Sequence, residues 1–300
     1  MVELRIIDRS TNKIEIEKVL GKNAIIFLYS NNFFSKIFLF LFAKIPLFSF
    51  IYGKIQATKI SRRKILPFIK KFNIDSSEFV KNVEDFQSFN DFFIRKLKKE
   101  KRPIETDEKI AILPADARYF VFENISLTDN FFIKGEKFDL RNFLQDDFLA
   151  KKYENGSMVI ARLCPSDYHR FHFCVSGTAL KPKLINGFLF SVNSIVLKKN
   201  MKIFYQNKRM LTLVKSKNFK DVLYVEIGAT NVGSIIETFN IDSLHEKGDE
   251  KGYFGLGASS VVLLFEKNTI KFSEDLILNS QKKLETKALF GEPLGKSLLV

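Results

Sequence analysis

The 300-residue chain is 46% hydrophobic and carries 48 Lys and Arg residues against 34 Asp and Glu residues, a formal net charge of +14. The apolar content excludes a disordered chain and suffices for a sizeable core. The positive charge favours an anionic partner, either a nucleic acid or an anionic membrane surface, although the abundance of Lys, Ile, Asn and Phe also fits an AT-rich genome.

The cysteines and the N-terminal residues indicate where in the cell the protein is located. Two cysteines, Cys164 and Cys174, exclude a disulfide framework, and no set of Cys, His and carboxylate residues predicts a metal site. Few cysteines are typical of a reducing, cytoplasmic-side location. The N-terminus contains acidic residues and lacks the apolar centre of a signal peptide.

Residues 24–52 form a strongly apolar stretch rich in phenylalanine. Lys36, Lys44 and Pro46 interrupt it, and the longest unbroken run, residues 37–43, is far shorter than the roughly 20 residues that span a bilayer. We expect one or two apolar helices that lie in the membrane interface or cover the core, with a true span as the less favoured alternative. A basic segment that would attract anionic lipid follows: Lys54, Lys59, Arg62, Arg63, Lys64, Lys70 and Lys71. Nucleic acid is disfavoured as a partner because the nearby phenylalanines occur in blocks, as in a core.

The residue pattern changes near Pro103, from helical spacing to short apolar runs. Residues 75–99 have helical spacing and open with a segment that resembles a capping box. From Lys109 onward, Gly, Asn, Asp and Pro clusters separate short apolar runs, and residues 274–289 resemble a closing helix. The expected strands are residues 119–125, 158–163, 172–176, 188–192, 210–214, 222–227, 234–239 and 260–265. The sequence therefore predicts an α+β protein, with a mainly helical, membrane-associating region at residues 1–103 and a β-rich domain at residues 104–300.

Residues 251–265 place two adjacent serines, Ser259 and Ser260, between a glycine-rich segment and a run of Val, Leu and Phe. The spacing fits neither a phosphate-binding G-x-G-x-x-G loop nor a G-x-S-x-G nucleophile elbow. A tight turn that leads into a buried hairpin strand is the simpler interpretation. A reactive serine beside easily bent backbone is the alternative.

Two of the three histidines, His169 and His172, lie three residues apart. In a helical turn they would share one side, whereas in a strand they would face opposite sides. Asp116 lies at an expected turn before a strand, where an acidic residue can serve turn chemistry alone. Together, Asp116, a histidine and Ser259 supply a carboxylate, a base and a hydroxyl, the parts of an activated nucleophile. The spacing in sequence does not show that they meet.

Six motifs occur in register: Phe-Phe-Ile-Arg-Lys-Leu-Lys (92–98), Pro-Ala-Asp-Ala (114–117), Asp-Tyr-His-Arg-Phe-His (167–172), Ile-Gly-Ala-Thr-Asn-Val-Gly-Ser-Ile (227–235), Lys-Gly-Asp-Glu (247–250) and Gly-Tyr-Phe-Gly-Leu-Gly-Ala-Ser-Ser-Val-Val-Leu-Leu-Phe (252–265). In this combination and order the chain resembles the phosphatidylserine decarboxylases. The resemblance runs from about residue 89 to residue 265. It implies an enzyme that cuts itself and uses a covalent pyruvoyl group.

The resemblance assigns a role to each candidate residue. Ser259 resembles the serine that becomes the pyruvoyl group, and the bond between Ala258 and Ser259 would be cut, giving a large chain, 1–258, and a small chain, 259–300. His172 resembles the base, Asp116 the carboxylate that orients the base, and His169 the histidine of decarboxylation. The pyruvoyl ketone would form a Schiff base with the serine amine of phosphatidylserine and accept the electrons left by CO₂, yielding phosphatidylethanolamine for phospholipid biosynthesis.

The resemblance also implies a peripheral enzyme on the cytoplasmic side of the cell membrane, acting as a homodimer of processed pairs. One residue departs from the family pattern, because Ala258 stands where the family has glycine before the serine. Alanine restricts the backbone there, so cleavage before Ser260 and an inactive membrane- or lipid-binding homologue are the alternatives.

Overall fold

The computed structural model describes residues 3–30, 32–127, 138–198, 200, 202–229, 235–256 and 259–299. The strands in chain order are β1 (Arg5–Asp8), β2 (Lys13–Ile16), β3 (Ile110–Ile112), β4 (Ala117–Phe122), β5 (Ser157–Leu163), β6 (Arg170–His172), β7 (Gly177–Ala179), β8 (Lys183–Ile185), β9 (Arg209–Ser216), β10 (Lys220–Ile227), β11 (Ile235–Glu237), β12 (Ser243–His245), β13 (Glu250–Phe254), β14 (Ser259–Phe265), β15 (Ile270–Phe272), β16 (Glu285–Ala288) and β17 (Pro293–Ser297).

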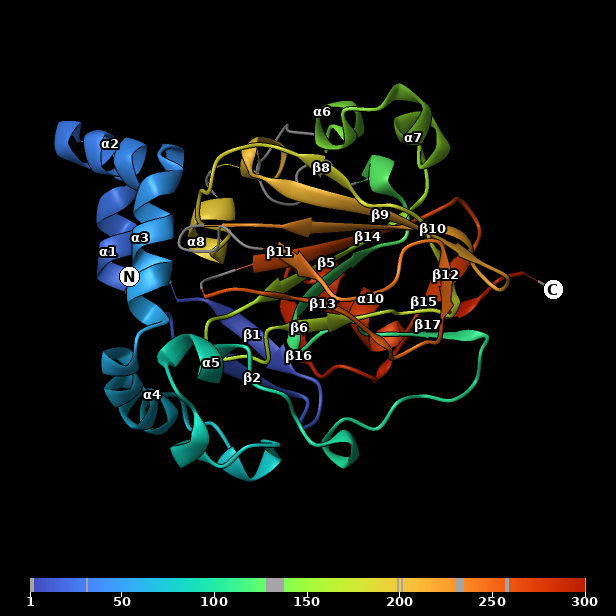
Figure 1. The fold of residues 1–300 in the computed structure, drawn as a ribbon. Helices are drawn as coiled ribbons and strands as arrows, with labels where there is room; N and C mark the ends of the chain where they lie inside the picture. Colours follow the sequence, from blue (N-terminus) through green and yellow to red (C-terminus); the bar gives the residue numbers. More distant parts are fainter. Residues whose placement is uncertain are drawn as a thin grey trace.

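Most of the helices lie around the periphery of the sheets (Figure 1). The α-helices are α1 (Lys22–Leu28), α2 (Phe33–Leu39), α3 (Pro46–Gln56), α4 (Ile65–Phe72), α5 (Phe89–Phe93), α6 (Leu140–Leu144), α7 (Asp147–Lys152), α8 (Ser194–Leu197), α9 (Ile203–Gln206) and α10 (Glu274–Gln281). The remaining turns are a π-helix, η1 (Phe40–Lys44), and the 3₁₀ helices η2 (Lys59–Lys64), η3 (Ser76–Glu78), η4 (Val83–Asp85), η5 (Lys99–Lys101) and η6 (Ile125–Leu127).

One large sheet forms the centre of the protein, with the strand order β12-β7-β9-β10-β14-β5-β4-β16-β1-β2 and β8 added beside β9. β14 lies in its middle, antiparallel to both β10 and β5. This position explains the unbroken Val-Leu-Phe run, because a strand with neighbours on both edges and cores on both faces is apolar throughout. Ser259 pairs with Leu163, and Ser260 pairs with Arg162 and Ile227.

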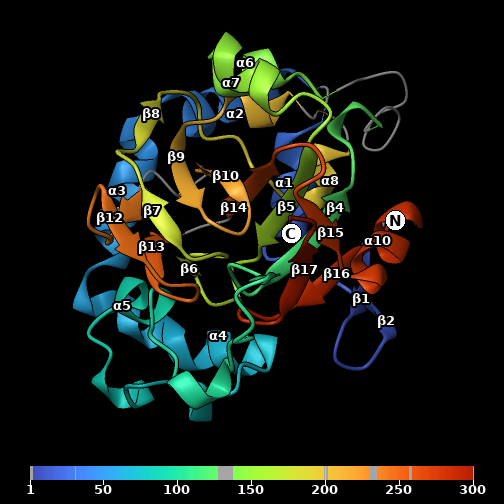
Figure 2. The same ribbon diagram turned by 90° about the vertical axis from the view of Figure 1, so that its right-hand side faces the viewer.

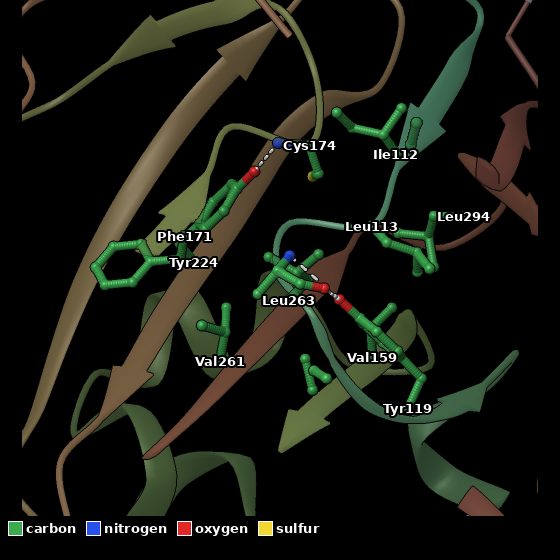
Figure 3. Close-up of a cluster of buried hydrophobic side chains, with 14 of the residues drawn as sticks. Ile112, Leu113, Tyr119, Val159, Phe171, Cys174, Tyr224, Val261, Leu263 and Leu294 are labelled. Atoms are coloured by element: carbon green, nitrogen blue, oxygen red, sulfur yellow. Dashed lines mark hydrogen bonds between the residues drawn. The ribbon is translucent and has the colours of Figure 1, made fainter. Parts of the chain in front are cut away.

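Apolar side chains pack on both faces of this sheet. One set, which we call the histidine-side core, contains Tyr168, Phe171, Phe254 and Phe290 together with the β14 residues Val261 and Leu263. Figure 3 shows part of it, including Phe171, Tyr224 and Val261. The other set, the helix-side core, contains Val262 and Leu264 of β14 and residues of α6, α8 and α9. Successive residues of β14 thus alternate between the two cores, as a pleated strand requires.

Two small sheets complete the β-structure. β11, β13 and β6 form one, and β15, β17 and β3 form the other. In Figure 2, β6 and β13 lie between the main sheet and α5. Phe171 of β6 and Phe254 of β13 belong to the histidine-side core, so the first small sheet packs against the main sheet on that face.

The N-terminal helices α1, α2 and α3 lie together on one side of the molecule, at the opposite end from the C-terminus (Figure 1). α4 and α5 enclose a separate cluster of buried phenylalanines, which Leu256 of the β13–β14 connection also joins. Among the described residues, no helix has the length and apolar character needed to cross a membrane.

The structure confirms the α+β class, and it changes several of the expected elements. Residues 5–16 contribute β1 and β2, and β1 pairs with β16 near the other end of the chain. Residues 75–99 form two 3₁₀ turns and the short α5 instead of long helices. The strand expected at residues 188–192 is absent; Phe188 makes only an isolated bridge to Asn207.

The expected closing helix at residues 274–289 was wrong in its second half. α10 ends at Gln281, and Lys283 then takes the left-handed conformation (φ 58°). The backbone N–H of Leu284 donates to the carbonyl of Asn279, which closes the helix end. Residues 285–288 then form β16, because their backbone pairs with both β1 and β4.

Candidate active site

Backbone hydrogen bonds and chain connectivity bring together the segments that carry the four candidate residues. The N–H of His172, on β6, donates to the carbonyl of Pro114 (2.8 Å), two residues before Asp116. The N–H of Phe254, the last residue of β13, donates to the carbonyl of His169 (3.0 Å). β13 leads within a few residues to Ser259, the first residue of β14. The loop before β4, the histidine strand and the start of β14 therefore form one region.

His172 is buried, and both of its ring nitrogens have hydrogen-bond partners. Nδ1 lies 3.0 Å from the carbonyl oxygen of Gly248, and Nε2 lies 3.2 Å from the hydroxyl of Tyr168. Burial lowers the pKa of His172 to about 4, so the ring is neutral near pH 7. A carbonyl can only accept, so the single proton lies on Nδ1. Nε2 is then the basic nitrogen and accepts from Tyr168.

Asp116 is also buried, and its carboxylate is held by Arg102 and by Phe290. Arg102 donates to it from Nε and from Nη2 (2.6 Å), and the backbone N–H of Phe290 donates to Oδ1 (2.9 Å). Arg102 also binds Glu78. The ring of Phe290 stacks on the imidazole of His172. Among the described residues, Phe290 contacts both Asp116 and His172, and no hydrogen bond joins these two side chains directly.

His169 is completely buried and stacks on Phe93 of α5, with ring centroids 3.9 Å apart. Nε2 lies 2.9 Å from the carbonyl oxygen of Cys164, so this nitrogen carries the proton in the neutral ring. Burial, with the nearby charge of Arg95, lowers the pKa of His169 to about 3. Nδ1 has no hydrogen-bond partner within the described part of the chain. His169 therefore presents a free lone pair.

Ser259 and Ser260 are both fully buried, and neither hydroxyl has a partner among the described residues. They differ in the face on which they lie. By the alternation of β14, Ser259 shares a face with Val261 and the histidine-side core, whereas Ser260 shares a face with Val262 and the helix-side core. The hydroxyl of Ser259 thus lies on the side of the sheet that carries the histidines. Ala258, the residue expected on the other side of the cut bond, lies outside the described residues.

Two cavities border this region. One, of about 560 Å³, lies between Phe50 and Lys54 of α3 and the residues Tyr253, Gly255 and Leu256 that precede the serines. The other, of about 600 Å³, is lined by Asp116, Tyr168 and several charged residues. Within the described ranges, no group of three or more His, Cys, Asp or Glu side chains could hold a metal ion.

Four residues that hold the site received no role from the sequence. Tyr168 and Gly248 each lie within one of the quoted motifs, which indicates that they are close to the site. The motifs do not predict their hydrogen bonds to His172. Arg102 belongs to a run of charged residues that is typical of a solvated surface, although it is buried against Asp116. Phe290 directly follows the expected helix at residues 274–289, and nothing in the sequence around it indicates a contact with His172.

Known proteins resemble the chain over nearly its whole length. A family model described as phosphatidylserine decarboxylase matches residues 89–296. The chain is 47% identical to a phosphatidylserine decarboxylase proenzyme of Chlamydia muridarum, over 98% of this chain and 97% of that protein. It is 45% identical to the Chlamydia pneumoniae proenzyme of the same name, over 97% and 96%, and 43% identical to that of Clostridium tetani, over 98% of each. The chain therefore belongs to the phosphatidylserine decarboxylase family and is an enzyme, a carboxy-lyase of this class.

Proposed function

We propose that the chain converts phosphatidylserine to phosphatidylethanolamine with a pyruvoyl group that it makes from Ser259. One observation carries the proposal: the Ser259 hydroxyl is buried, lacks a partner among the described residues and lies on the histidine side of the sheet. A buried hydroxyl without a partner is costly, and such groups gather at reactive sites. The names of the relatives, which include the word proenzyme, support a chain that is processed.

Self-cleavage would proceed by an acyl shift. His172 takes the proton of the Ser259 hydroxyl, and the oxygen attacks the carbonyl carbon of Ala258. The protonated His172 then gives this proton to the amide nitrogen, the C–N bond breaks, and an ester forms. Loss of the α-proton of residue 259 then expels the Ala258 carboxylate and leaves a dehydroalanine, whose imine form takes up water and releases ammonia. The small chain, 259–300, then begins with a ketone.

The surroundings of Ser259 fit such a group. It would supply a carbonyl that condenses with the amine of the substrate and accepts the electron pair left by CO₂. Residue 259 begins a strand that has hydrogen-bonded neighbours on both sides, and it pairs with Leu163 of β5. The apolar residues of the histidine-side core exclude water from this face, which favours the conversion of a charged carboxylate into neutral CO₂.

Two residues would move protons in decarboxylation and self-cleavage, and a third would position one of them. Nε2 of His172 is the base for Ser259. Asp116 positions His172 through Phe290, because Asp116 binds the backbone of Phe290 while the ring of Phe290 covers the imidazole. The free Nδ1 of His169 accepts a proton from the ammonium group of the substrate and returns it to the carbon that loses CO₂.

The N-terminal helices would dock the enzyme on an anionic membrane. Large apolar side chains of α2 and α3 are exposed, including Phe33 (71%), Phe34 (66%) and Phe50 (61%). Basic residues of η2 follow directly in the chain. The cavity between α3 and the Gly255–Leu256 segment would let a head group pass from this surface toward Ser259. A homodimer of processed pairs stays a prediction.

The test compares Ser259→Ala with Ser260→Ala. Each chain is expressed, analysed by denaturing mass spectrometry and incubated with phosphatidylserine vesicles, and phosphatidylethanolamine is measured. Ser259→Ala should stay uncut and form no product, whereas Ser260→Ala should be cut and remain active. Cleavage of Ser259→Ala would show that the nucleophile is another residue. An uncut and inactive parent chain would favour the inactive lipid-binding homologue.

A further inference from the structure

The cavity of about 560 Å³ beside α3, which we call the α3 cavity, has a positively charged lining. Lys54 and Lys208 line it, and no Asp or Glu does so among the described residues. The other polar side chains of its lining are neutral: Ser49, Asn90, Asn186 and Tyr253. A cavity with two cations, neutral hydroxyl and amide groups and no carboxylate favours an anionic ligand.

Ser49 gives a second, independent indication of a ligand. Only 5% of its surface is exposed, and its hydroxyl has no hydrogen-bond partner among the described residues. A serine hydroxyl within a helix commonly donates to the carbonyl one turn earlier, and Ser49 does not do so. Because a buried hydroxyl without a partner is costly and Ser49 lines the α3 cavity, a ligand with an acceptor oxygen would satisfy it.

Lys54 lies on the same helix, five residues after Ser49, where polar and apolar groups meet at the surface. Its Nζ lies 5.4 Å from the ring centroid of Phe50, which also lines the cavity and is 61% exposed. Leu47 and Ile51 of α3 are exposed as well. A cation beside exposed apolar side chains suits an anionic lipid, whose phosphate needs the charge and whose acyl chains need the apolar surface.

The α3 cavity also reaches the segments that carry the candidate catalytic residues. Ile94 of its lining directly follows Phe93, whose ring stacks on His169. Leu256, also in the lining, precedes Ser259 by three residues, and three residues span at most about 11 Å. In phosphatidylserine, one methylene and one oxygen separate the reacting carbon from the phosphorus. A phosphate in this cavity is therefore at a suitable range from the proposed reaction.

We propose that the α3 cavity binds the phosphodiester of a glycerophospholipid, with the Ser49 hydroxyl and the Lys54 ammonium as donors to it, and thereby holds the head group of the substrate. This proposal rests on the proposed conversion of phosphatidylserine. The acyl chains would leave the cavity over the exposed apolar side chains of α3. The two residues bind the substrate and take no part in self-cleavage.

Gly53, one turn after Ser49, allows a test that does not weaken the helix. It lines the α3 cavity, and a Cβ placed there meets no atom within 4 Å. Gly53→Leu should therefore fill the cavity, and it should also favour α3, because leucine is the better helix former. The matched control is Ala57→Leu, which adds the same side chain at the exposed end of α3, outside the cavity lining.

Binding is measured by calorimetry on the full-length Ser259→Ala chain, so the result does not depend on self-cleavage. The probe is dihexanoyl phosphatidylmethanol below its micelle concentration, which has the phosphodiester and no amine or carboxylate. Lys54→Gln and Ser49→Ala should each weaken binding about tenfold, the loss of one charge-assisted hydrogen bond. Gly53→Leu should abolish binding, and Ala57→Leu should leave it unchanged. No binding by the parent chain, parent-like binding by Gly53→Leu, or equally tight binding of inorganic phosphate would overturn the proposal.

A kinetic experiment separates this proposal from the proposed function. Chains that retain Ser259 are checked for self-cleavage by denaturing mass spectrometry, and the decarboxylation of dihexanoyl phosphatidylserine is followed. Lys54→Gln should be cut like the parent and raise KM about tenfold with little change in kcat, because the phosphate is bound equally before and during the reaction. The control Lys267→Gln changes an exposed lysine outside the cavity and should keep the parent KM.

The two proposals fail in different ways. If the parent chain is neither cut nor active, the proposed function fails, and the calorimetric result still decides whether the cavity binds a phosphodiester. If the parent chain is cut and active but Lys54→Gln keeps the parent KM, only the head-group site fails.

Discussion

The ring of Phe290 lies on the imidazole of His172, with centroids 3.7 Å apart and planes 14° apart. The backbone N–H of Phe290 donates to Asp116 at 2.9 Å. Phe290 belongs to the proposed small chain, whereas His172 and Asp116 belong to the large chain. Both products of self-cleavage would thus contribute to one site, and the C-terminal segment would have to be folded in place before the cut.

Phe290→Leu should slow self-cleavage about tenfold, because the imidazole loses the flat surface that holds it while the backbone bond to Asp116 remains. The rate is measured by denaturing mass spectrometry after cell-free translation. The matched control is Phe272→Leu, which removes a ring from the same core at a position not in contact with His172. Both variants should lose about 1–2 kcal/mol of stability. Equal cleavage rates in the two variants would contradict a positioning role for Phe290.

Acidification should destabilise the uncut chain, in part through His172. Its pKa is about 4 in the folded chain and 6.5 in the reference state, so between these values the unfolded chain binds a proton that the folded chain does not. The contribution of the neutral His172 to the free energy of unfolding is therefore fully present above pH 6.5 and is lost as the pH falls toward 4.

The size of this effect can be isolated by mutation. Between pH 7 and pH 5, His172 should account for a loss of about 2 kcal/mol in the free energy of unfolding. Urea unfolding of Ser259→Ala is compared with that of Ser259→Ala/His172→Gln at both pH values. The double variant should lose about 2 kcal/mol less over this interval. An identical loss in both chains would mean that His172 is accessible to protons in the folded state.

Membrane docking should depend on the exposed phenylalanines of α2 and α3. A Phe33→Ser/Phe50→Ser chain is expected to copellet more weakly with vesicles that contain phosphatidylserine, because each exposed ring contributes apolar area to the interface. The control is Phe148→Ser on α7, which removes an equally exposed ring (76%) from a part of the molecule distant from these helices (Figure 1). Added salt should weaken binding of the parent chain. Equal loss in both variants would argue against a specific docking surface.

The two chains should remain associated after the cut. β14, at the start of the small chain, is hydrogen-bonded between β10 and β5 of the large chain, and β16 lies between β4 and β1. A buried ion pair adds to this, since Arg162 of the large chain binds Glu285 of the small chain. Gel filtration should elute both fragments together in buffer and separately in strong denaturant. Separation in buffer would be inconsistent with this sheet.

The sequence identified features that depend on local pattern, such as the apolar run of β14 and the α+β class. It was less successful where long-range pairing decides the structure. Residues 285–288 form a strand because β1 and β4 offer edges on both sides, and no local pattern reveals this. Residues 5–8 form a strand for the same reason.

The candidate site shows the same division. The residue types of Asp116, His169, His172 and Ser259 were recognisable from motifs. Their partners were not, because Arg102, Gly248 and Phe290 reach the site through packing between distant segments. Nδ1 of His172 is hydrogen-bonded to the carbonyl of Gly248 and not to a carboxylate. This contact depends on how the folded loops pack, and the spacing of residues along the sequence does not predict it.

We propose that the chain cuts itself before Ser259 and converts this residue into a ketone. The most direct measurement is the mass of the freshly purified polypeptides under denaturing conditions, combined with a reaction of the small fragment with a hydrazine. We expect two fragments, residues 1–258 and 259–300, the smaller one without a free α-amine and reactive as a ketone. An intact chain, or a small fragment that begins with an ordinary serine, would contradict it.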